Sequence, residues 1–343
     1  MTTAPGSEPG AFLWPDAKSE SLLRKYLTDE VWHALRGLQT HSGATLFDCI
    51  RSGLTHSDSA IGVYAADEES LRCFGPLFDP LIQDLHDNAA AYEQPEGKQS
   101  VVDPAILNLD PQGIYIRSSR IRIARNICGY RLMPTIHCDE LMEVQQLLRA
   151  TFERFENGLA GNYRGIDNPD TSGFDGTDKF QQAAGICRFW PDGRGIFTNH
   201  AGTLQIWVNE EDHLRIVSVQ QDSNIQAAYR RAVHACSELE RSLQFGHSSR
   251  YGYLASCPTN LGSGLRASFH IHLPLTGGSS AFENICSAYG IAVRSATGES
   301  GSQSGPVYDI SNRYRMRLTP ERCIHKLLTG ALQLIELEKL AAR

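Results

Sequence analysis

The feature that most constrains the fold of this chain is an alternating run of polar and apolar side chains at residues 266–273. Successive side chains of an extended strand point to opposite faces, so the run predicts a strand with one polar and one apolar face. The polar face carries Arg266, Ser268, His270 and His272. The apolar face carries Ala267, Phe269, Ile271 and Leu273. A sheet built from such strands must bury its apolar face against another layer.

The polar face of this predicted strand has the chemistry of an anion-binding surface. Cys257 and a glycine-rich bend at residues 262–264 precede it, and Arg266 opens it. A cation and imidazoles beside a flexible bend suit an anionic ligand that has a planar ring, and a nucleotide fits that description.

Further arginines extend the same pattern. Arg120 and Arg122 alternate with isoleucines, so their guanidinium groups share one strand face, while Arg125 falls on the other face or past the strand end. Two adjacent cations repel each other unless an anion bridges them, although a solvated strand edge is the alternative. Arg215 follows Glu211 by four residues across a turn and could simply be its salt-bridge partner. Together with Arg266 and Arg294, these residues predict an arginine cradle for a polyphosphate, formed by Arg120, Arg122, Arg215, Arg266 and Arg294.

The distribution of patterns predicts an α+β protein with two domains. We expect a flexible tail at residues 1–18, a small all-helical domain at 19–92, a linker at 93–110, and a domain at 111–343 in which helices flank a mostly antiparallel sheet. Expected helices in the first domain are one over residues 21–38 and one that starts at Asp79 and Pro80. Expected helices in the second domain cover 139–158, 223–243 and the segment after Thr319. Expected strands are 113–117, 119–124, 185–190, 204–209, 214–220, 251–257, 266–273, 290–294 and 307–309. Segments 157–178 and 295–305 read as mobile loops.

Composition excludes several classes of function. The net charge of −7 does not favour binding to nucleic acid or to a membrane surface, and no apolar run approaches the roughly 20 residues that span a bilayer. The nine cysteines include no CxxC pair, which argues against a disulfide framework and a zinc site and favours a reducing, cytoplasmic compartment. Neither a Gly-x-Gly-x-x-Gly turn nor a Walker A motif is present.

Five motifs resemble those of the phosphagen (guanidino) kinases, the family of arginine and creatine kinases. They are FGPLFDP at residues 74–80, SSRIR at 118–122, NEEDHLR at 209–215, CPTNLGSGLRAS at 257–268 and VYDISN at 307–312. The resemblance implies transfer of the γ-phosphoryl group of ATP to a guanidino nitrogen, with Mg²⁺ carried by the nucleotide and no direct protein ligand for the metal. It implies a monomer or a homodimer.

The resemblance also assigns roles to residues. The positions it assigns to ATP binding are Ser118, Ser119, Arg120, Ile121, Arg122, Arg215, Arg266, Ala267, Ser268, Phe269, His270, Arg294, Ser295, Ala296, Thr297 and Gly298. The positions it assigns to the guanidino substrate are Ala60, Ile61, Gly62, Val63, Tyr64, Glu211, Cys257 and Glu299. The two glutamates would hold the guanidinium group. Cys257 would lie against that group as a thiolate, with Thr259, Ser263 and Arg266 lowering its pKa. Without the resemblance, Cys257 is read as a small buried hydrophobic residue.

The loop at residues 60–64 indicates which guanidine is bound. Its length and its terminal Tyr64 resemble arginine kinases, so arginine is the expected acceptor, ahead of taurocyamine, lombricine and creatine. A protein-arginine kinase and an inactive nucleotide-binding relative are the rival interpretations. The chain departs from the family pattern at Thr171, Thr198, Thr297 and Pro306, which puts nucleotide affinity and loop closure in question.

Overall fold

The computed structural model describes residues 15–16, 18–86, 109–166, 178–295 and 306–343. Most of the predicted tail and linker therefore lies outside the described residues, as do Thr171 and residues 296–299. In the described part, five helices form the N-terminal region: α1 (Leu22–Tyr26), α2 (Asp29–Leu35), α3 (Leu46–Thr55), α4 (Ser70–Cys73) and α5 (Gly75–Leu85). The predicted all-helical character of this region is confirmed.

Two helix predictions in this region are wrong in detail. The segment 21–38 is divided in two, because the Thr28 side chain accepts a hydrogen bond from the Val31 N–H and caps a new helix. Helix α5 begins at Gly75, with Pro76 in its first turn, and Pro80 lies inside it. Asp79 is therefore not a cap, and its carboxylate contacts another part of the molecule.

The C-terminal region is built on an eight-stranded sheet in which every neighbouring pair is antiparallel. In spatial order the strands are β2 (Gly161–Gly165), β3 (Gly195–Asn199), β4 (Leu204–Val208), β5 (Leu214–Gln220), β1 (Ile116–Arg125), β8 (Leu265–His272), β10 (Val307–Asn312) and β9 (Ile291–Ser295). A two-stranded hairpin, β6 (His247–Ser248) and β7 (Gly252–Tyr253), lies outside this sheet. The predicted α+β fold with an antiparallel sheet is confirmed.

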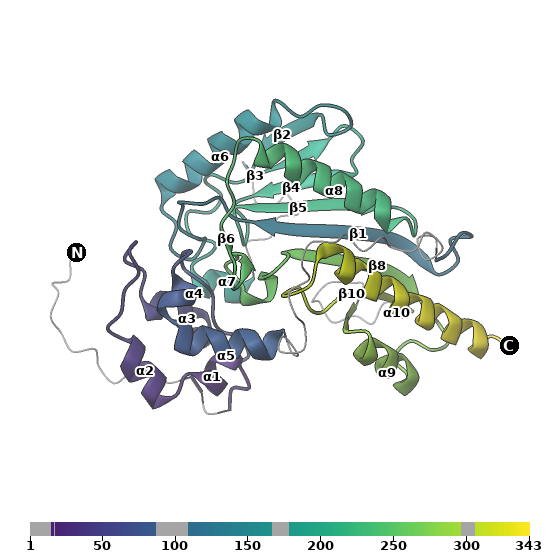
Figure 1. The fold of residues 1–343 in the computed structure, drawn as a ribbon, viewed down its shortest axis with the longest axis horizontal. Helices are drawn as coiled ribbons and strands as arrows, with labels where there is room; N and C mark the ends of the chain where they lie inside the picture. Colours follow the sequence, from purple (N-terminus) through teal and green to yellow (C-terminus); the bar gives the residue numbers. More distant parts are fainter. Residues whose placement is uncertain (1–14, 17, 87–108, 167–177, 296–305) are drawn as a thin grey trace.

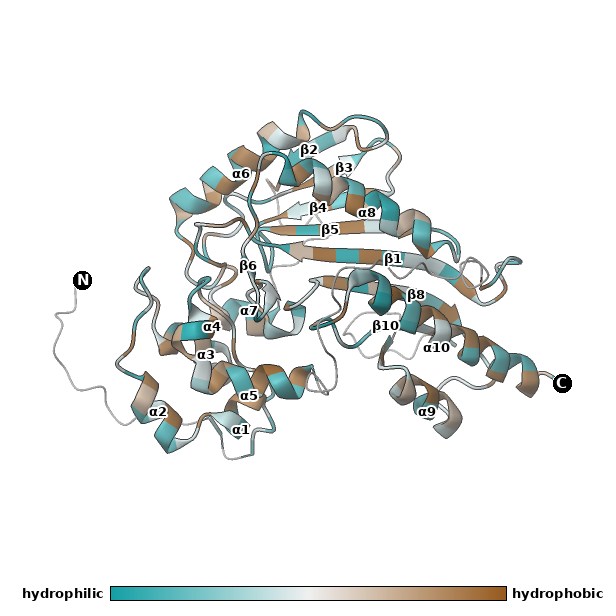
Figure 2. Ribbon diagram, in the orientation of Figure 1, coloured by the Kyte–Doolittle hydropathy of each residue, from teal (hydrophilic) through white to brown (hydrophobic). Residues whose placement is uncertain are grey.

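Long helices cover one face of this sheet. Figure 1 shows α8 (Ile225–Glu240) lying along β5 and β1, and α10 (Pro320–Ala341) along β8. Under these helices the apolar residues of the central strands, such as Ile121 and Phe269, are fully buried in the main hydrophobic core. The alternation behind this burial is visible as bands of differing hydropathy along β1 (Figure 2). Helices α8 and α10 do not cover the opposite face of the sheet. Three further α-helices of this region are α6 (Cys138–Phe152), α7 (Lys179–Ala184) and α9 (Ser280–Ala288).

The strand predicted at residues 185–190 is wrong, because that segment forms turns. Gly185 adopts a left-handed conformation (φ 85°) and ends α7. The buried guanidinium of Arg194 then donates hydrogen bonds to the carbonyl oxygens of Ile186, Arg188 and Asp192 and holds the turns in place. The prediction at 251–257 is reduced to the two residues of β7.

Strands β2 and β3 were not predicted. The richness of residues 157–178 in Gly, Asp and Asn predicts a mobile loop there, and residues 161–165 lie inside that segment. In the sheet, Gly161 approaches β3 so closely that a Cβ atom would lie 2.1 Å from the Thr198 carbonyl oxygen. The glycine therefore permits close strand pairing rather than mobility.

The helical region and the sheet region share a second hydrophobic core. Its members from the sheet region include Leu132, Tyr251, Leu254, Leu261 and Met316, which pack with the buried side chains of the helices. The two regions therefore bury apolar side chains against each other.

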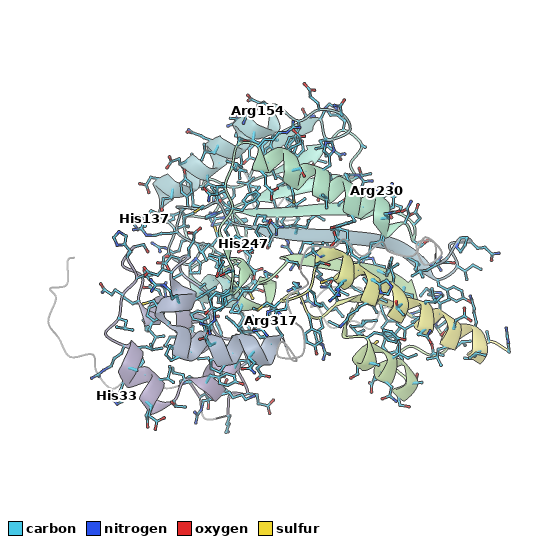
Figure 3. The ribbon with its side chains drawn as sticks, in the orientation of Figure 1. His33, His137, Arg154, Arg230, His247 and Arg317 are labelled. Carbon is cyan, nitrogen blue, oxygen red and sulfur yellow. The ribbon has the colours of Figure 1, made fainter. Side chains whose placement is uncertain are left out.

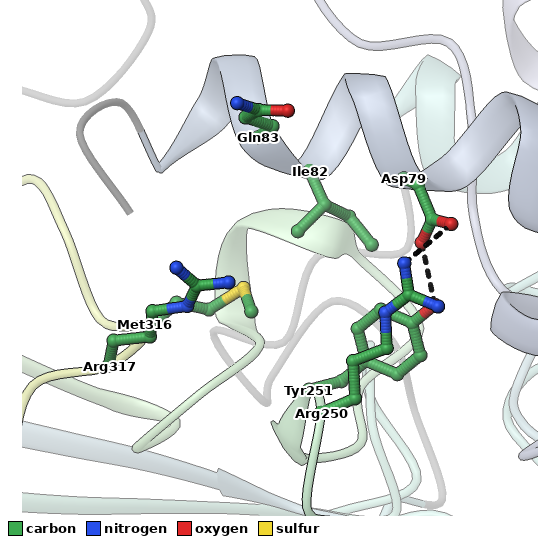
Figure 4. A pocket seen from close by; sticks show the side chains of 7 residues that line it. All are labelled: Asp79, Ile82, Gln83, Arg250, Tyr251, Met316 and Arg317. Carbon is green, nitrogen blue, oxygen red and sulfur yellow. Dashed lines mark hydrogen bonds and ion pairs between the residues drawn. The ribbon is translucent and has the colours of Figure 1, made fainter. Parts of the chain in front are cut away.

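A polar contact reinforces the same junction (Figure 4). The Asp79 carboxylate accepts a hydrogen bond from the Tyr251 hydroxyl at 2.7 Å and pairs with the Arg250 guanidinium at 2.7 Å. These two residues, with Met316 and Arg317, line a cavity of about 190 Å³ against α5. In the described ranges, no helix is long and apolar enough to cross a membrane.

Candidate active site

Strand register places the five arginines of the cradle on one face of the sheet. Residues directly opposite each other on antiparallel neighbours point to the same side. Arg122 is opposite Arg266, and Ala124, on the same side as Arg122, is opposite Arg215. Asp309 is opposite both His270 and Arg294, which brings the outer strand into the same set. This face is the one that α8 and α10 leave uncovered. The predicted juxtaposition of the five residues is therefore present.

The central arginines of the cradle are partly or fully buried, and burial lowers the pKa of the Arg120, Arg122 and Arg266 side chains. Neighbouring arginines add to that effect: Arg215 for Arg120 and Arg122, and Arg294 for Arg266. By contrast, the six basic side chains labelled in Figure 3 are all exposed to solvent. A concentration of buried positive charge on a sheet face is stabilised when a polyanion binds there.

Two cradle arginines are held by acidic partners. Arg215 pairs with Glu210 (Nη1 to Oε1, 2.5 Å) and lies over the Trp207 ring at 5.3 Å. Arg266 pairs with Asp309 (Nη2 to Oδ2, 2.7 Å). The alternative that Arg215 forms a salt bridge with Glu211 is wrong, because Arg215 pairs with Glu210 instead. These pairs fix each guanidinium while leaving some of its N–H donors for a ligand.

The turn that carries Glu210 and Glu211 is rigid. Asn209 adopts a left-handed conformation (φ 55°), and its amide donates hydrogen bonds to the carbonyl oxygens of Leu141 and Gly193. Asp212 turns away from the cradle and accepts hydrogen bonds from the Asn126 side chain and the Ser256 N–H. Of the three consecutive acidic residues, Glu210 and Glu211 therefore point to the site, and Asp212 stabilises the turn.

His213, which follows that run, is also structural. Its Nδ1 accepts a hydrogen bond from the Ile127 N–H, so the proton lies on Nε2, which donates to the Arg131 carbonyl oxygen. Burial lowers the pKa of the imidazole to about 4, which keeps it neutral near pH 7.

Glu211 is connected to the cradle by Asn260. The Asn260 amide donates a hydrogen bond to Glu211 Oε2 at 3.1 Å, and its oxygen accepts from Arg122 at 3.4 Å and from Arg315 at 3.2 Å. Burial, and then the charges of Asp212 and Glu210, raise the pKa of Glu211 to about 7. The Glu211 carboxylate thus lies next to the cradle, but the nearby arginines do not fully balance its negative charge, so it can bind a further cation.

Cys257 lies beside Glu211, and its protonation differs from the prediction. Burial, followed by the negative charge of Glu211, raises the pKa of the thiol to about 12. A contact with the Thr259 hydroxyl at 3.1 Å lowers the pKa but does not outweigh the first two effects. The predicted lowering of the Cys257 pKa is wrong, because burial and the Glu211 charge outweigh the contact with Thr259.

The loop at residues 60–64 reaches this site from the helical region. Tyr64 packs in one buried cluster with Cys257, and burial followed by the charges of Cys257 and Glu211 raises its pKa. The Ala65 N–H donates a hydrogen bond to the Ser256 carbonyl oxygen at 2.7 Å, which fixes the loop next to Cys257. Gly62 and Val63 are buried, whereas Ala60 is exposed and Ile61 partly exposed.

Some predicted site residues face away from the cradle. The side chains of Ser119, Ile121, Ala267 and Phe269 are fully buried on the helix-covered face. A ligand in the cradle cannot contact those side chains. On the cradle face, the Ser118 hydroxyl lies 3.2 Å from His270 Nδ1, and Ser268 is buried opposite Arg120.

The second substrate glutamate lies outside the described residues. Strand β9 ends at Ser295, and Ala296, Thr297, Gly298 and Glu299 follow it in the chain. Of the departures from the family pattern, Thr198 lies in β3 and pairs with Asn162 of β2 and Gln205 of β4, and the Pro306 carbonyl oxygen accepts a hydrogen bond from the Leu273 N–H.

Sequence reasoning missed several residues of this site. Glu210, Asp309, Trp207, Asn260 and Arg315 contact predicted site residues but were given no role. Asn260 lies inside the motif at 257–268, and an amide side chain at that position of the motif indicates a polar contact within the site. Across the described ranges, no group of three His, Cys, Asp or Glu side chains could hold a metal ion.

Comparisons with known proteins identify relatives of the whole chain. Residues 17–83 match the profile of the ATP:guanido phosphotransferase N-terminal domain, and residues 140–341 match that of its C-terminal catalytic domain. The arginine kinase of Limulus polyphemus is 40% identical over 334 residues, which cover 94% of each chain.

Solved structures give the same result. The duplicated taurocyamine kinase from Schistosoma mansoni, solved with transition-state-analogue components, superposes with a TM-score of 0.88 at 29% identity. The alignment covers 95% of this chain and 47% of that one. A lombricine kinase superposes with a TM-score of 0.81 at 29% identity, covering 94% of this chain and 92% of the other.

Proposed function

This chain belongs to the ATP:guanido phosphotransferase family, and from that premise we propose that it transfers the γ-phosphoryl group of ATP to the guanidino nitrogen of L-arginine. The products would be phosphoarginine and ADP, and the reversible reaction would buffer the ATP supply. In the forward direction an N–P bond forms, the bond from the γ-phosphorus to the ADP oxygen breaks, and the guanidinium releases one proton to solvent.

The observation that carries this proposal is that the positive arginine cradle and the negative Glu211 carboxylate lie next to each other on the uncovered sheet face. The arginine cradle is suited to a triphosphate, and Glu211 adjoins it through Asn260. Phosphoryl transfer depends mainly on alignment and on stabilising charge on the equatorial oxygens. Preoriented guanidinium groups in a partly buried site supply that stabilisation. Mg²⁺ would enter with the nucleotide as part of the substrate.

The acceptor would be held by the residues around Cys257. A guanidinium has a pKa of about 12 or above and attacks poorly while its charge is delocalised. The Glu211 carboxylate would bind the planar group and draw its charge away from the attacking nitrogen. We assign Glu299 the matching role on the other side of the guanidinium. The Cys257 thiol would position the group, and the proposed cradle-facing contacts to nucleotide are Ser118, Arg120, Arg122, Arg215, Arg266, Ser268, His270 and Arg294.

Arginine is the favoured acceptor for two reasons. Identity to the Limulus arginine kinase is 40%, against 29% to the taurocyamine and lombricine kinase structures. Tyr64, the residue in which the acceptor loop resembles arginine kinases, also packs in one buried cluster with Cys257, next to the proposed acceptor site. Taurocyamine, lombricine or creatine would be the alternative acceptors within the same chemistry.

The proposal extends to the setting of the enzyme. All nine cysteines lie in described residues and none of them forms a disulfide, which supports a reducing cytoplasmic compartment. The enzyme would act as a monomer or as a homodimer.

The test is a ³¹P NMR assay of the purified chain with MgATP and, in separate samples, arginine, taurocyamine, lombricine, creatine, glycocyamine or a denatured basic protein. We expect a phosphoarginine resonance, with a kcat/KM for arginine higher than for the other acceptors. Preference for another guanidine would overturn the acceptor assignment alone. Transfer only to a denatured basic protein, or no transfer to any acceptor, would overturn the proposed reaction.

A further inference from the structure

Arg125, the last residue of β1, is a buried cation that the proposed reaction does not use. It lies on the helix-covered face of the sheet, opposite the cradle, and is 6% exposed. No ion pair links it to an acidic side chain in the parts of the chain that the structure describes; its contacts are two carbonyl oxygens and an aromatic ring. A buried guanidinium without a carboxylate is costly, so its surroundings must compensate for the lost hydration.

The compensating contacts come from the bend at residues 262–264. Arg125 Nη1 donates hydrogen bonds to the carbonyl oxygens of Ala124 at 2.8 Å and Ser263 at 3.1 Å. The guanidinium carbon lies 3.4 Å from the centroid of the Tyr253 ring, a close cation–π contact. At Gly264 (φ 66°), a Cβ atom would lie 2.7 Å from Arg125 Nη1. The guanidinium therefore fills the space beneath the bend.

The same bend connects two residues of the candidate site. It follows Asn260, which contacts Glu211 and Arg122, and it precedes Arg266 at the start of β8. Backbone hydrogen bonds also support the bend: the N–H groups of Gly262 and Ser263 donate to the carbonyl oxygens of Tyr251 and Arg315, and the carbonyl oxygens of Gly262 and Gly264 accept from the N–H groups of Tyr253 and Ala124. The Arg125 guanidinium adds a charged side-chain contact to this backbone support.

We propose that Arg125 is a positioning residue for nucleotide binding, which holds the Ser263 carbonyl and so fixes the bend that orients Asn260 and Arg266. It acts through the bend and touches no ligand, because it lies on the other face of the sheet. The inference rests on the proposed function only in taking a nucleotide as the ligand of the cradle.

The test measures MgADP binding by isothermal titration calorimetry, well below the melting temperature, for Arg125→Met, Arg125→Lys and Tyr253→Leu. Loss of a charge-assisted hydrogen bond and its stack predicts a rise in the MgADP Kd of about tenfold for Arg125→Met. The lysine variant keeps the charge but not the planar contact, so we expect an intermediate Kd. Tyr253→Leu removes the ring alone and should raise the Kd by a smaller factor.

Arg230→Met is the matched control, since Arg230 is an exposed arginine on α8 (Figure 3). Its MgADP Kd should equal that of the unmodified chain. If Arg125 were needed only for stability, Arg125→Met would lower the melting temperature and leave the MgADP Kd unchanged. A folded Arg125→Met variant whose MgADP Kd is within twofold of that of the unmodified chain would therefore overturn the proposal. Should Arg125→Met not fold, unchanged Kd values in both other variants would overturn it equally. An unmodified chain that binds MgADP but phosphorylates no guanidine would instead contradict the proposed function.

Discussion

Glu211 is the residue whose charge state most affects both binding and stability. Its pKa, raised by burial to about 7, means that the carboxylate is only partly ionised at neutral pH in the ligand-free molecule. Only the ionised form attracts a guanidinium. Arginine affinity should therefore be retained above pH 7 and should fall about tenfold per pH unit well below it. Titrations of arginine between pH 5.5 and 8.5 will check this, and Glu211→Gln should show weak binding without that dependence.

The same residue, Glu211, should affect folding stability in the opposite direction: a rise in pH that favours arginine binding should lower the stability of the fold. A carboxyl group whose folded pKa is raised stabilises the fold only at low pH, and that contribution is lost as the pH rises through about 7. At pH 8 the buried charge is a cost, so Glu211→Gln should increase the free energy of unfolding by up to about 3 kcal/mol while phosphoryl transfer falls by about 100-fold or more. Urea denaturation at pH 5 and pH 8 measures the difference. A variant that is less stable at pH 8 than the unmodified chain would contradict the assigned pKa.

Cys257 provides a reporter of the neighbouring charge. Because Glu211 contributes to the raised pKa of the thiol, Glu211→Gln should increase the rate at which iodoacetamide alkylates Cys257 at pH 8. Mass spectrometry of the Cys257 peptide gives that rate, and exposed Cys128 in the same sample is the internal reference. An unchanged ratio of the two rates would show that Glu211 does not act on the thiol.

At the scale of elements, the acceptor loop is positioned by a contact between two glycines. Gly62 has a φ of 74°, and a Cβ atom there would lie 2.8 Å from the Cα atom of Gly53 in α3. Gly62→Ala should displace the loop and raise the arginine Kd by about tenfold or more, with little effect on MgADP binding. Gly43→Ala is the control for backbone strain alone, since Gly43 has a φ of 85° and no atom within 4 Å of its would-be Cβ. Equal arginine affinities in the two variants would contradict the role of the contact.

Elements with a regular period were predictable from the sequence, and those fixed by distant contacts were not. The alternation in β8 and β1 gave the two faces and hence the shared face of the arginines. The turns at residues 185–190 depend on Arg194, whose hydrogen bonds cannot be read from local pattern. The pairing of Arg215 with Glu210 rather than Glu211 likewise depends on the left-handed Asn209 and the direction it gives to the turn.

At the scale of the whole molecule, the shared core implies one cooperative unit. Tyr251, Leu254, Leu261 and Met316 of the sheet region are buried in one cluster with apolar side chains of the helices. Residues 111–343 expressed alone should expose this surface and aggregate, and the full chain should unfold in a single calorimetric transition. Two separated transitions, or a soluble folded fragment, would contradict the shared core.

The polar junction at Asp79 should contribute unequally through its two partners. Arg250 is largely exposed, so Arg250→Ala should cost less than about 1 kcal/mol of unfolding free energy. The Tyr251 hydroxyl is buried against the same carboxylate, so Tyr251→Phe should cost about 1–2 kcal/mol. Urea denaturation of both variants checks the order, and a larger loss for Arg250→Ala would reverse it.

The central claim is that one end of the uncovered sheet face has two adjoining compartments of opposite charge. The most direct measurement is a calorimetric comparison of MgADP and arginine binding to Arg120→Ala and Glu211→Gln. We predict that Arg120→Ala raises the MgADP Kd by about 100-fold while arginine binds nearly as before, and that Glu211→Gln does the reverse. Variants that both weaken the same ligand, or that leave both ligands unaffected, would contradict the claim.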